Sequence, residues 1–363
     1  MTNPQFGVMY HLTGSTPDVW RNDFDALAAG GFHRLVLWDA NNNVDILRTA
    51  LDLCGERSLR GYSLIWNPAL FAKQHSKPGD PFLKYQCVGI DGQTVDYHNP
   101  FHAGFRHEAL RPYLRQAIQG TINHRALGGY FLDDVLDAPS IISYTDHDAE
   151  QFRAFVLDKY GHVELVAKAW GRDLRDWRDV TPPRIMLPWR EGWRRWWDDW
   201  CEARQRWWVD WTDDVLAEMP ERAGQERILG DDWFSLRSGR NIVGGFTPEL
   251  AAKFDAFSFD YTRGVDFLDP AMTNIDRDIV MARDLVGPKK LTVFLKAASA
   301  ADQPFPNMRD VIAQSERCIK ARVVGIDYYI YRASPDNYAF KNCLANHPQA
   351  FNELASFVRD GRR

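Results

Sequence analysis

Short apolar runs alternate with longer amphipathic stretches along the whole 363-residue chain. The runs are nearly continuous in apolar residues, which is typical of parallel strands that are buried on both faces. Eight of them are predicted as strands: FGVMYHL from Phe6, RLVLWDA from Arg34, GYSLIWN from Gly61, GGYFLDDV from Gly128, RILGDDWF from Arg227, DAFSFDYT from Asp255, KLTVFLKA from Lys290 and GIDYYIYR from Gly325.

Between these runs, apolar residues recur at three- and four-residue spacing. This periodicity predicts helices over residues 17–29, 44–57, 107–122, 269–285, 308–321 and 348–358. Strand followed by helix, repeated eight times, predicts an α/β protein with the (β/α)8 TIM-barrel fold. No Pro- or Ser-rich linker divides the chain, so we expect one domain over residues 1–363.

The fourth predicted strand is followed by a long insertion, over about residues 136–226. It is much longer than an ordinary connection from strand to helix, and it ends in an aromatic helix over residues 189–219. Trp197 and Trp208 lie outside the tryptophan stripe of this helix, so they are candidates for contacts with a cleft or with a partner subunit in a homo-oligomer. The stripe itself predicts a face that packs on the barrel, and it consists of Trp189, Trp193, Trp196, Trp200, Trp207 and Trp211.

Composition and charge exclude several classes of protein. A net charge of −5 with mixed signs does not favour nucleic-acid or membrane-surface binding. No apolar run approaches the ~18 residues of a membrane span, and the N-terminus lacks the features of a signal peptide. The five cysteines are scattered without metal-ligand spacing. We therefore expect a cytoplasmic protein with reduced thiols, without a metal or another cofactor.

Candidate chemistry lies at the ends of the predicted strands, because barrel enzymes place their reactive groups there. Carboxylates follow at least four strands and are interleaved with aromatic residues. In chain order the strand ends are Tyr10 and His11, Trp38 and Asp39, Trp66 and Asn67, Asp133 and Asp134, Asp231 to Trp233, Asp260 and Tyr261, Lys296, and then Tyr329, Tyr331 and Arg332. A single aspartate here, such as Asp39, is also explained as a helix N-cap.

Two carboxyl groups that face one cavity are suited to cleaving a glycosidic bond. One delivers a proton to the leaving oxygen, and the other attacks the anomeric carbon or activates water. Aromatic faces stack on the C–H surfaces of sugars, and polar side chains bind the hydroxyl groups. The high aromatic content, with 14 Trp, 13 Tyr and 21 Phe, is explained either by a large core or by such a sugar cleft.

Several segments resemble the catalytic barrel of glycoside hydrolase family 42, the β-galactosidase family. These segments are GVMYHLTGSTPDVWRNDFDALAAGGFHRLVLW, DGQTVDYHNPFHAGFRHEALRPYLRQAI, LAAKFDAFSFDYT and GIDYYIYR. The most specific is FRAFVLDKYGHVELVAKAWG with the following WRDVTPPR. The resemblance implies a retaining glycosidase whose fourth strand ends in Asn-Glu, with the glutamate as acid/base, and whose nucleophile is a glutamate at the end of the seventh strand.

This chain departs from that pattern at both positions. Asp133 and Asp134 stand in place of Asn-Glu, so the resemblance implies that Asp134 is the acid/base. The seventh strand offers Lys296 instead of a carboxylate. Three interpretations remain open: the second carboxylate is Asp232 or Asp260, with Asp133 or Asp134 opposite it; Lys296 forms a Schiff base as in aldolase-type barrels; or the barrel binds saccharides without cleaving them. Lys296 is also explained by a salt bridge or by contacts to substrate hydroxyls.

We therefore predict a glycosidase acting on a glycoside or oligosaccharide. Asp134, Asp260 and Asp232 are the catalytic candidates. His98, His102 and His107 follow the third strand, and their spacing favours surface or substrate contacts over a zinc site. The predicted substrate-binding residues are Tyr10, Trp38, Asp39, Trp66, Asn67, His98, Asp133, Trp233, Tyr261, Lys296, Tyr331 and Arg332.

Overall fold

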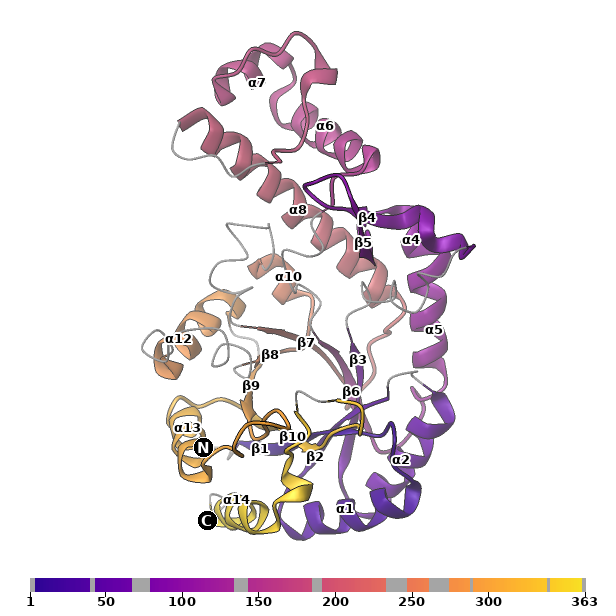
Figure 1. Cartoon of the computed structure of the whole chain (residues 1–363), viewed down its shortest axis with the longest axis vertical. Helices are drawn as coiled ribbons and strands as arrows, with labels where there is room; N and C mark the ends of the chain where they lie inside the picture. The colour runs from indigo at the N-terminus through magenta and orange to yellow at the C-terminus, as the bar shows by residue number, and fades with distance from the viewer. Residues whose placement is uncertain are drawn as a thin grey trace.

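In the computed structural model, parallel strands close into a barrel that is surrounded by helices (Figure 1). The structure describes residues 4–39, 43–66, 79–133, 143–184, 191–232, 247–260, 274–287, 290–337 and 340–360. The barrel strands are β1 (Gln5–His11), β2 (Arg34–Trp38), β3 (Arg60–Trp66), β6 (Leu127–Asp133), β7 (Glu226–Asp232), β8 (Ala256–Asp260), β9 (Lys290–Lys296) and β10 (Gly325–Arg332). They pair in this order, and β10 closes the barrel on β1. All eight predicted strands and the (β/α)8 fold are confirmed.

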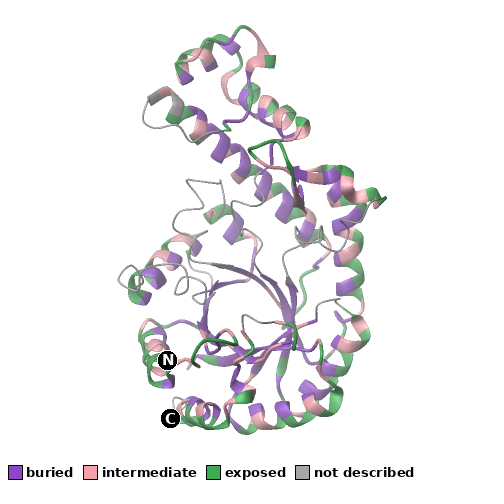
Figure 2. Ribbon diagram, in the orientation of Figure 1, coloured by how far each residue is buried: buried purple, intermediate pink, exposed green. Residues whose placement is uncertain are grey.

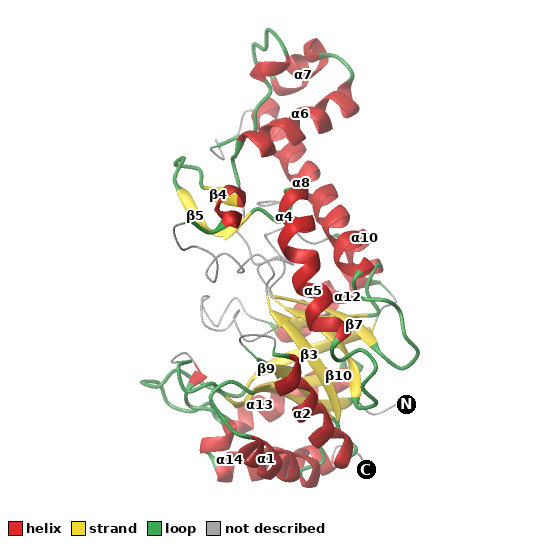
Figure 3. Ribbon diagram, turned by 90° about the vertical axis from the view of Figure 1, so that its right-hand side faces the viewer, coloured by secondary structure: helices red, strands yellow, loops and turns green. Residues whose placement is uncertain are grey.

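The helices of the outer layer overlap those that the sequence periodicity predicts, whereas the short helices at residues 248–252 and 344–346 were not predicted. They pack around the strands in Figure 3. The N-cap of α2 is Asn43, whose side chain accepts hydrogen bonds from the amides of Asp45 and Ile46. The helices beside the barrel are α1 (Pro17–Ala29), α2 (Val44–Glu56), α5 (Arg111–Gln119), α10 (Pro248–Ala252), α12 (Ile275–Val286), α13 (Met308–Lys320), η9 (Leu344–Asn346) and α14 (Pro348–Asp360).

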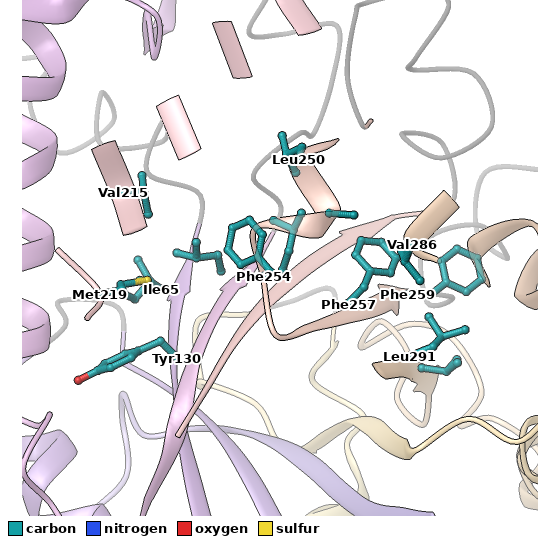
Figure 4. Packing of buried hydrophobic residues seen from close by; sticks show 14 of the residues in the cluster. Ile65, Tyr130, Val215, Met219, Leu250, Phe254, Phe257, Phe259, Val286 and Leu291 are labelled. Atoms are coloured by element: carbon teal, nitrogen blue, oxygen red, sulfur yellow. The ribbon is translucent and has the colours of Figure 1, made fainter. Parts of the chain in front are cut away.

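Successive strand residues face opposite sides of the barrel wall, and this alternation produces two hydrophobic clusters. In β8, Phe257 and Phe259 belong to the outer cluster between strands and helices, whereas Ala256 belongs to the inner cluster. Figure 4 shows part of the outer cluster, including these two phenylalanines. Phe131 of β6 and Phe294 of β9 pack edge to face inside the barrel, with ring centroids 5.3 Å apart. Side chains therefore fill the middle of the barrel, and polar groups face its two ends.

The connection from β6 to β7 carries α6 (Asp146–Tyr160), α7 (Val163–Trp170), η5 (Trp177–Asp179) and α8 (Glu191–Ala217). These helices extend away from the barrel in Figure 1, and Figure 2 shows a buried face along α8. The predicted stripe is buried at Trp196, Trp200, Trp207 and Trp211. The rings of Trp196 and Trp200 pack on Trp170 of α7 and Phe152 of α6, within the insertion and not on the barrel as predicted. The prediction for Trp208 was wrong, because its ring is only 2% exposed. It packs edge to face on Phe101, which lies in the preceding connection, at 4.9 Å.

The connection from β3 to β6 contains a small sheet that the sequence did not predict. β4 (Gln86–Val88) and β5 (Thr94–His98) pair antiparallel, between η2 (Pro81–Tyr85) and the turns α4 (Ala103–Phe105) and η3 (Arg106–Leu110). Both strands are short and carry polar residues, so they lack the apolar run by which the barrel strands were found. Asn99 after β5 donates to Asp148 of α6 at 2.7 Å, which links this sheet to the insertion.

Candidate active site

Strand register brings the predicted strand-end residues to one end of the barrel. His11 is paired with Trp38, Trp66 with Asp133, and Asp232 with Asp260. Lys296 of β9 is paired with Tyr329 of β10. Because all the strands are parallel, these pairs line the C-terminal mouth, where barrel enzymes carry their active sites.

His11 is a mouth residue that was not among the predicted contacts. It follows Met9, which lies in the inner cluster, so strand alternation directs His11 to the inside as well. Its ring lies 4.2 Å from that of Trp38 and 6.4 Å from that of Tyr329, between centroids. Its Nδ1 accepts a hydrogen bond from the backbone amide of Ser334 at 3.1 Å. This bond leaves Nε2 as the protonated nitrogen of the neutral ring.

Burial lowers the pKa of His11 to about 3, so the ring is neutral in the folded protein at pH 7. An unfolded histidine has a pKa of about 6.5 and binds a proton more readily. The contribution to stability is therefore complete above pH 6.5 and is lost as the pH falls toward 3. Between pH 7 and pH 5 we expect this one group to cost about 2 kcal/mol of unfolding free energy.

Urea denaturation at the two pH values measures this loss. The His11→Gln variant lacks the titrating ring, so its stability should fall by about 2 kcal/mol less than that of the wild type. His162→Gln, at an exposed histidine, is the matched control and should follow the wild type. Equal losses in wild type and His11→Gln would contradict a neutral, buried His11.

Asp133 and Asp260 are carboxylates at the barrel mouth whose side chains are described, and they are 8% and 7% exposed. A Cβ atom built on Gly230 of β7 would lie 2.8 Å from Oδ1 of Asp133. The carboxylate of Asp133 therefore lies against the neighbouring strand, at a position where only glycine leaves room. Asp260 follows Ser258 by two residues and Ala256 by four, which places it on the inner face of β8.

Asp39 and Trp38 follow β2 in different roles. Oδ1 of Asp39 accepts a hydrogen bond from the Thr13 hydroxyl at 3.1 Å, and Oδ2 accepts one from the backbone amide of Asn43 at 2.8 Å. Asp39 is 1% exposed and connects the loop after β1 to the start of α2. Asp39 is not the N-cap of α2, because that position is occupied by Asn43. Trp38 packs against the inner cluster and is only partly buried, so part of this residue is exposed at the mouth.

Lys296 and Tyr329 stand on the last two strands. Lys296 ends β9 two residues after Phe294, which belongs to the inner cluster, so it is on the inner face of the strand. Its side chain is partly exposed. Tyr329 packs edge to face on Phe340 at 4.6 Å and was not among the predicted contacts, although it is a strand-end residue. Alternation along β10 does not predict the inward orientation of Tyr329, because Tyr329 and its neighbour Ile330 both contact the inner cluster.

Three predicted substrate contacts were wrong, because they lie in the helix layer. Tyr10 is 0% exposed, and its hydroxyl donates to Asp23 of α1 at 2.6 Å. Arg332 forms an ion pair with the same carboxylate, its Nη2 donating to Oδ1 at 2.9 Å. Tyr331 packs edge to face on Phe351 of α14 at 5.2 Å. Tyr10 and Tyr331 alternate with mouth residues along their strands and therefore face outward.

The prediction for His98 was also wrong. Its side chain is 0% exposed and stacks on Phe105 with centroids 4.9 Å apart, in the small sheet of β4 and β5. The remaining predicted site residues fall outside the described part of the chain. These are Asn67, Asp134, Trp233 and Tyr261, together with the side chains of Trp66 and Asp232.

Within the described ranges, no group of three or more His, Cys, Asp or Glu side chains has an arrangement suited to a metal ion. In the same ranges, no helix has the length and apolar character required to cross a bilayer.

Solved structures with a similar fold are glycosidases. The β-galactosidase from the psychrophilic Marinomonas ef1 aligns with a TM-score of 0.78 and 14% identity, covering 98% of this chain and 59% of that protein. Gan42B, a GH42 β-galactosidase, aligns with a TM-score of 0.77 and 12% identity, covering 99% and 56%. The chain shares the barrel fold of these β-galactosidases, of which Gan42B belongs to family 42. It therefore spans less than two thirds of the length of these β-galactosidases.

A second kind of glycosidase shares the fold. The catalytic domain of the β-amylase from Paenibacillus polymyxa aligns with a TM-score of 0.68 and 12% identity, covering 99% of each chain. No protein-family model matches the sequence, and neither does any curated protein. At these identities the likeness is one of fold, so the activity has to be argued from the residues of the mouth.

Proposed function

We propose that this protein is a glycoside hydrolase that cleaves its substrate at the C-terminal mouth of the barrel. The observation that carries the proposal is the carboxylate Asp260 at the end of β8, at the same mouth as His11, Trp38 and the end of β6, where Asp133 directly precedes the proposed acid Asp134. A pair of carboxyl groups with aromatic neighbours is the equipment that glycosidic cleavage requires. Structural likeness to β-galactosidases and a β-amylase supports the same reaction class.

In the proposed mechanism, Asp134 donates a proton to the leaving oxygen. Asp260 is its ionised partner, and Asp232, its register neighbour, is the alternative. Asp133 holds the end of β6 in place by lying over Gly230. Lys296 belongs to the inner face of β9, the strand next to β8.

The substrate is proposed to be an oligosaccharide or glycoside. Trp38 provides the aromatic face for a sugar ring, and neutral His11 offers one hydrogen-bond donor to a hydroxyl group. Tyr329 takes the place that the sequence assigned to Tyr10 and Tyr331, because its ring packs at the inner side of the barrel. Asp39 holds the loops on which these residues depend.

A panel of α- and β-aryl glycosides and oligosaccharides tests the proposal. We expect the wild type to hydrolyse at least one of them and Asp134→Asn to lose that activity by about 10²-fold or more. Full activity of Asp134→Asn would overturn its assignment as the acid. Saturable calorimetric binding of a saccharide without turnover over long incubation would instead support a barrel that only binds sugars.

Lys296 carries a second candidate function. It stands where the resemblance places the nucleophile of family 42, and a lysine amine in a partly buried site is suited to Schiff-base chemistry. Borohydride reduction in the presence of small carbonyl substrates, followed by mass spectrometry, tests it. An adduct that is lost in Lys296→Ala would favour a lyase. No adduct, or one that persists in the variant, would remove this alternative.

A further inference from the structure

The opposite end of the barrel holds a cavity that the proposed mechanism does not use. It has a volume of about 450 Å³ and is lined by the first residues of several strands, including Gln5, Arg34, Glu226 and Lys290. Because the strands are parallel, these residues lie at the N-terminal end of the barrel, each at the start of a strand of five to seven residues. The cavity is within the size range of small-molecule sites.

Arg34, which lines this cavity, belongs to a buried ion pair. Nη2 of Arg34 lies 2.5 Å from Oδ2 of Asp327, and their side chains are 3% and 0% exposed. A Cβ atom on Gly7 would lie 2.1 Å from Oδ1 of Asp327, and one on Gly325 would lie 3.3 Å from Nη1 of Arg34. Two glycines therefore make room for the pair, and Arg34 is held in one orientation.

Two buried polar atoms at the cavity have no hydrogen-bond partner among the described residues. They are Nε of Arg34 and Oγ1 of Thr292, and both residues are 2% exposed and line the cavity. A buried donor without a partner is costly, so such groups in folded proteins are normally satisfied by water or a ligand. The guanidinium nitrogen is a donor only, and the hydroxyl group is able to donate, so each of the two atoms suits a hydrogen-bond acceptor.

The charges around the cavity leave one cation in excess. Lys290 forms an ion pair with Glu226, and the Tyr62 hydroxyl donates to the second oxygen of Glu226 at 2.9 Å. Although burial opposes ionisation, these two partners keep the pKa of Glu226 below its ordinary value. Arg34 is paired with Asp327, although burial raises the pKa of that carboxyl. Arg322 at the rim forms no ion pair with another described residue, so its positive charge is not balanced.

We propose that this cavity is a binding site for a small organic anion, either a carboxylate or a phosphate ester. The anionic group would accept from Arg34 Nε and Thr292 Oγ1 and would balance the charge of Arg322. Ile319, Val323 and Val324 form an apolar side of the same cavity, which suits a carbon skeleton rather than a bare ion. The site lies at the other end of the barrel from the carboxylates of the mouth, so it would be separate from the proposed catalytic site.

Calorimetric titration of the full chain tests the proposal with three probes: inorganic phosphate, glucose 6-phosphate and gluconate. Glucose is the uncharged control. We expect saturable binding of glucose 6-phosphate or gluconate, stronger than that of inorganic phosphate, and none of glucose. The preferred probe identifies the anion as a phosphate or a carboxylate. Absence of saturable binding by all three anions would overturn the proposal.

Two variants locate the site. Thr292→Val removes the hydroxyl group at constant shape, and Arg322→Asn removes the charge while suiting the positive φ of 60° at this position. Each should weaken binding by about 10-fold or more, because each removes a hydrogen bond or charge that meets the anion. Unchanged binding in both variants would overturn the assignment.

Arg309→Asn is the matched control, because Arg309 is exposed at the other end of α13, roughly 20 Å along the helix from Arg322. It should bind the anion as the wild type does. Asp260→Asn should also bind normally, so a failure of the proposed hydrolase function would leave this test unaffected.

Discussion

Replacing Asp260 by asparagine is expected to lower kcat/KM for glycoside hydrolysis by about 10²- to 10⁴-fold. The change removes the negative charge of a carboxylate and retains its shape. Asp260 ends β8 on the inner face and is 7% exposed. An amide in that position neither attacks an anomeric carbon nor takes a proton from water, so the loss should appear in kcat rather than in substrate binding.

Asp255→Asn is the matched control for this prediction. Asp255 immediately precedes β8, at the other end of the strand, and its carboxylate forms an ion pair with Arg227 at 3.1 Å. The control should retain wild-type kcat and KM on the best aryl glycoside. If Asp260→Asn hydrolysed that substrate as fast as the wild type, Asp260 would have no part in the reaction, and Asp232 would become the candidate partner of Asp134.

Replacing Arg34 by methionine is expected to lower the free energy of unfolding by about 3–5 kcal/mol. The reason is the carboxylate that remains. Asp327 is 0% exposed, and burial raises the pKa of its carboxyl while the Arg34 guanidinium opposes that shift. Without Arg34, the folded protein would either bury an unpaired charge or bind a proton that the unfolded chain does not hold at pH 7. Both alternatives destabilise the folded state.

Urea denaturation of a double-mutant cycle measures this effect. The Arg34→Met/Asp327→Leu variant removes both charges and should recover much of the loss, because a buried ion pair replaced by apolar groups is often neutral. Arg175→Met is the surface control. The Arg175 side chain in its ion pair with Asp179 is 82% exposed, so its removal should leave the free energy of unfolding nearly unchanged. A loss below 1 kcal/mol in Arg34→Met would contradict a tightly coupled buried pair.

The barrel itself was predictable because each of its strands has a local sequence signal. A strand buried on both faces has to be apolar throughout, and such a run stands out against amphipathic helices. The pair β4 and β5 was not predictable by the same signal, because a short antiparallel pair with polar residues resembles a loop. Trp208 shows a related limit: it lies off the stripe of α8, yet the connection containing Phe101 covers it from the other side.

The candidate site was predictable only as a set of strand ends. Asp133 and Asp260 are the last residues of their strands, and both are on the inner face of the barrel wall. Tyr10 and His11 are neighbours in sequence, and of the two only the tyrosine was predicted to contact the substrate. Side chains alternate across a strand, so a shift of one residue exchanges the mouth for the helix layer. Nothing in the residue types distinguishes the two, because tyrosine and histidine are both plausible sugar contacts.

The sequence by itself determined the (β/α)8 architecture, the position of the insertion and the end of the barrel where carboxylates gather. These features depend on periodicity, which neighbouring residues carry. Only the tertiary structure decided which strand-end side chains face the mouth, with His11 and Tyr329 inside and Tyr10 and Tyr331 in the helix layer. It also brought Arg34 to Asp327, 293 positions away, and so formed a polar cavity at the far end of the barrel. Contacts between such distant residues arise from closing the barrel, and no local pattern encodes them.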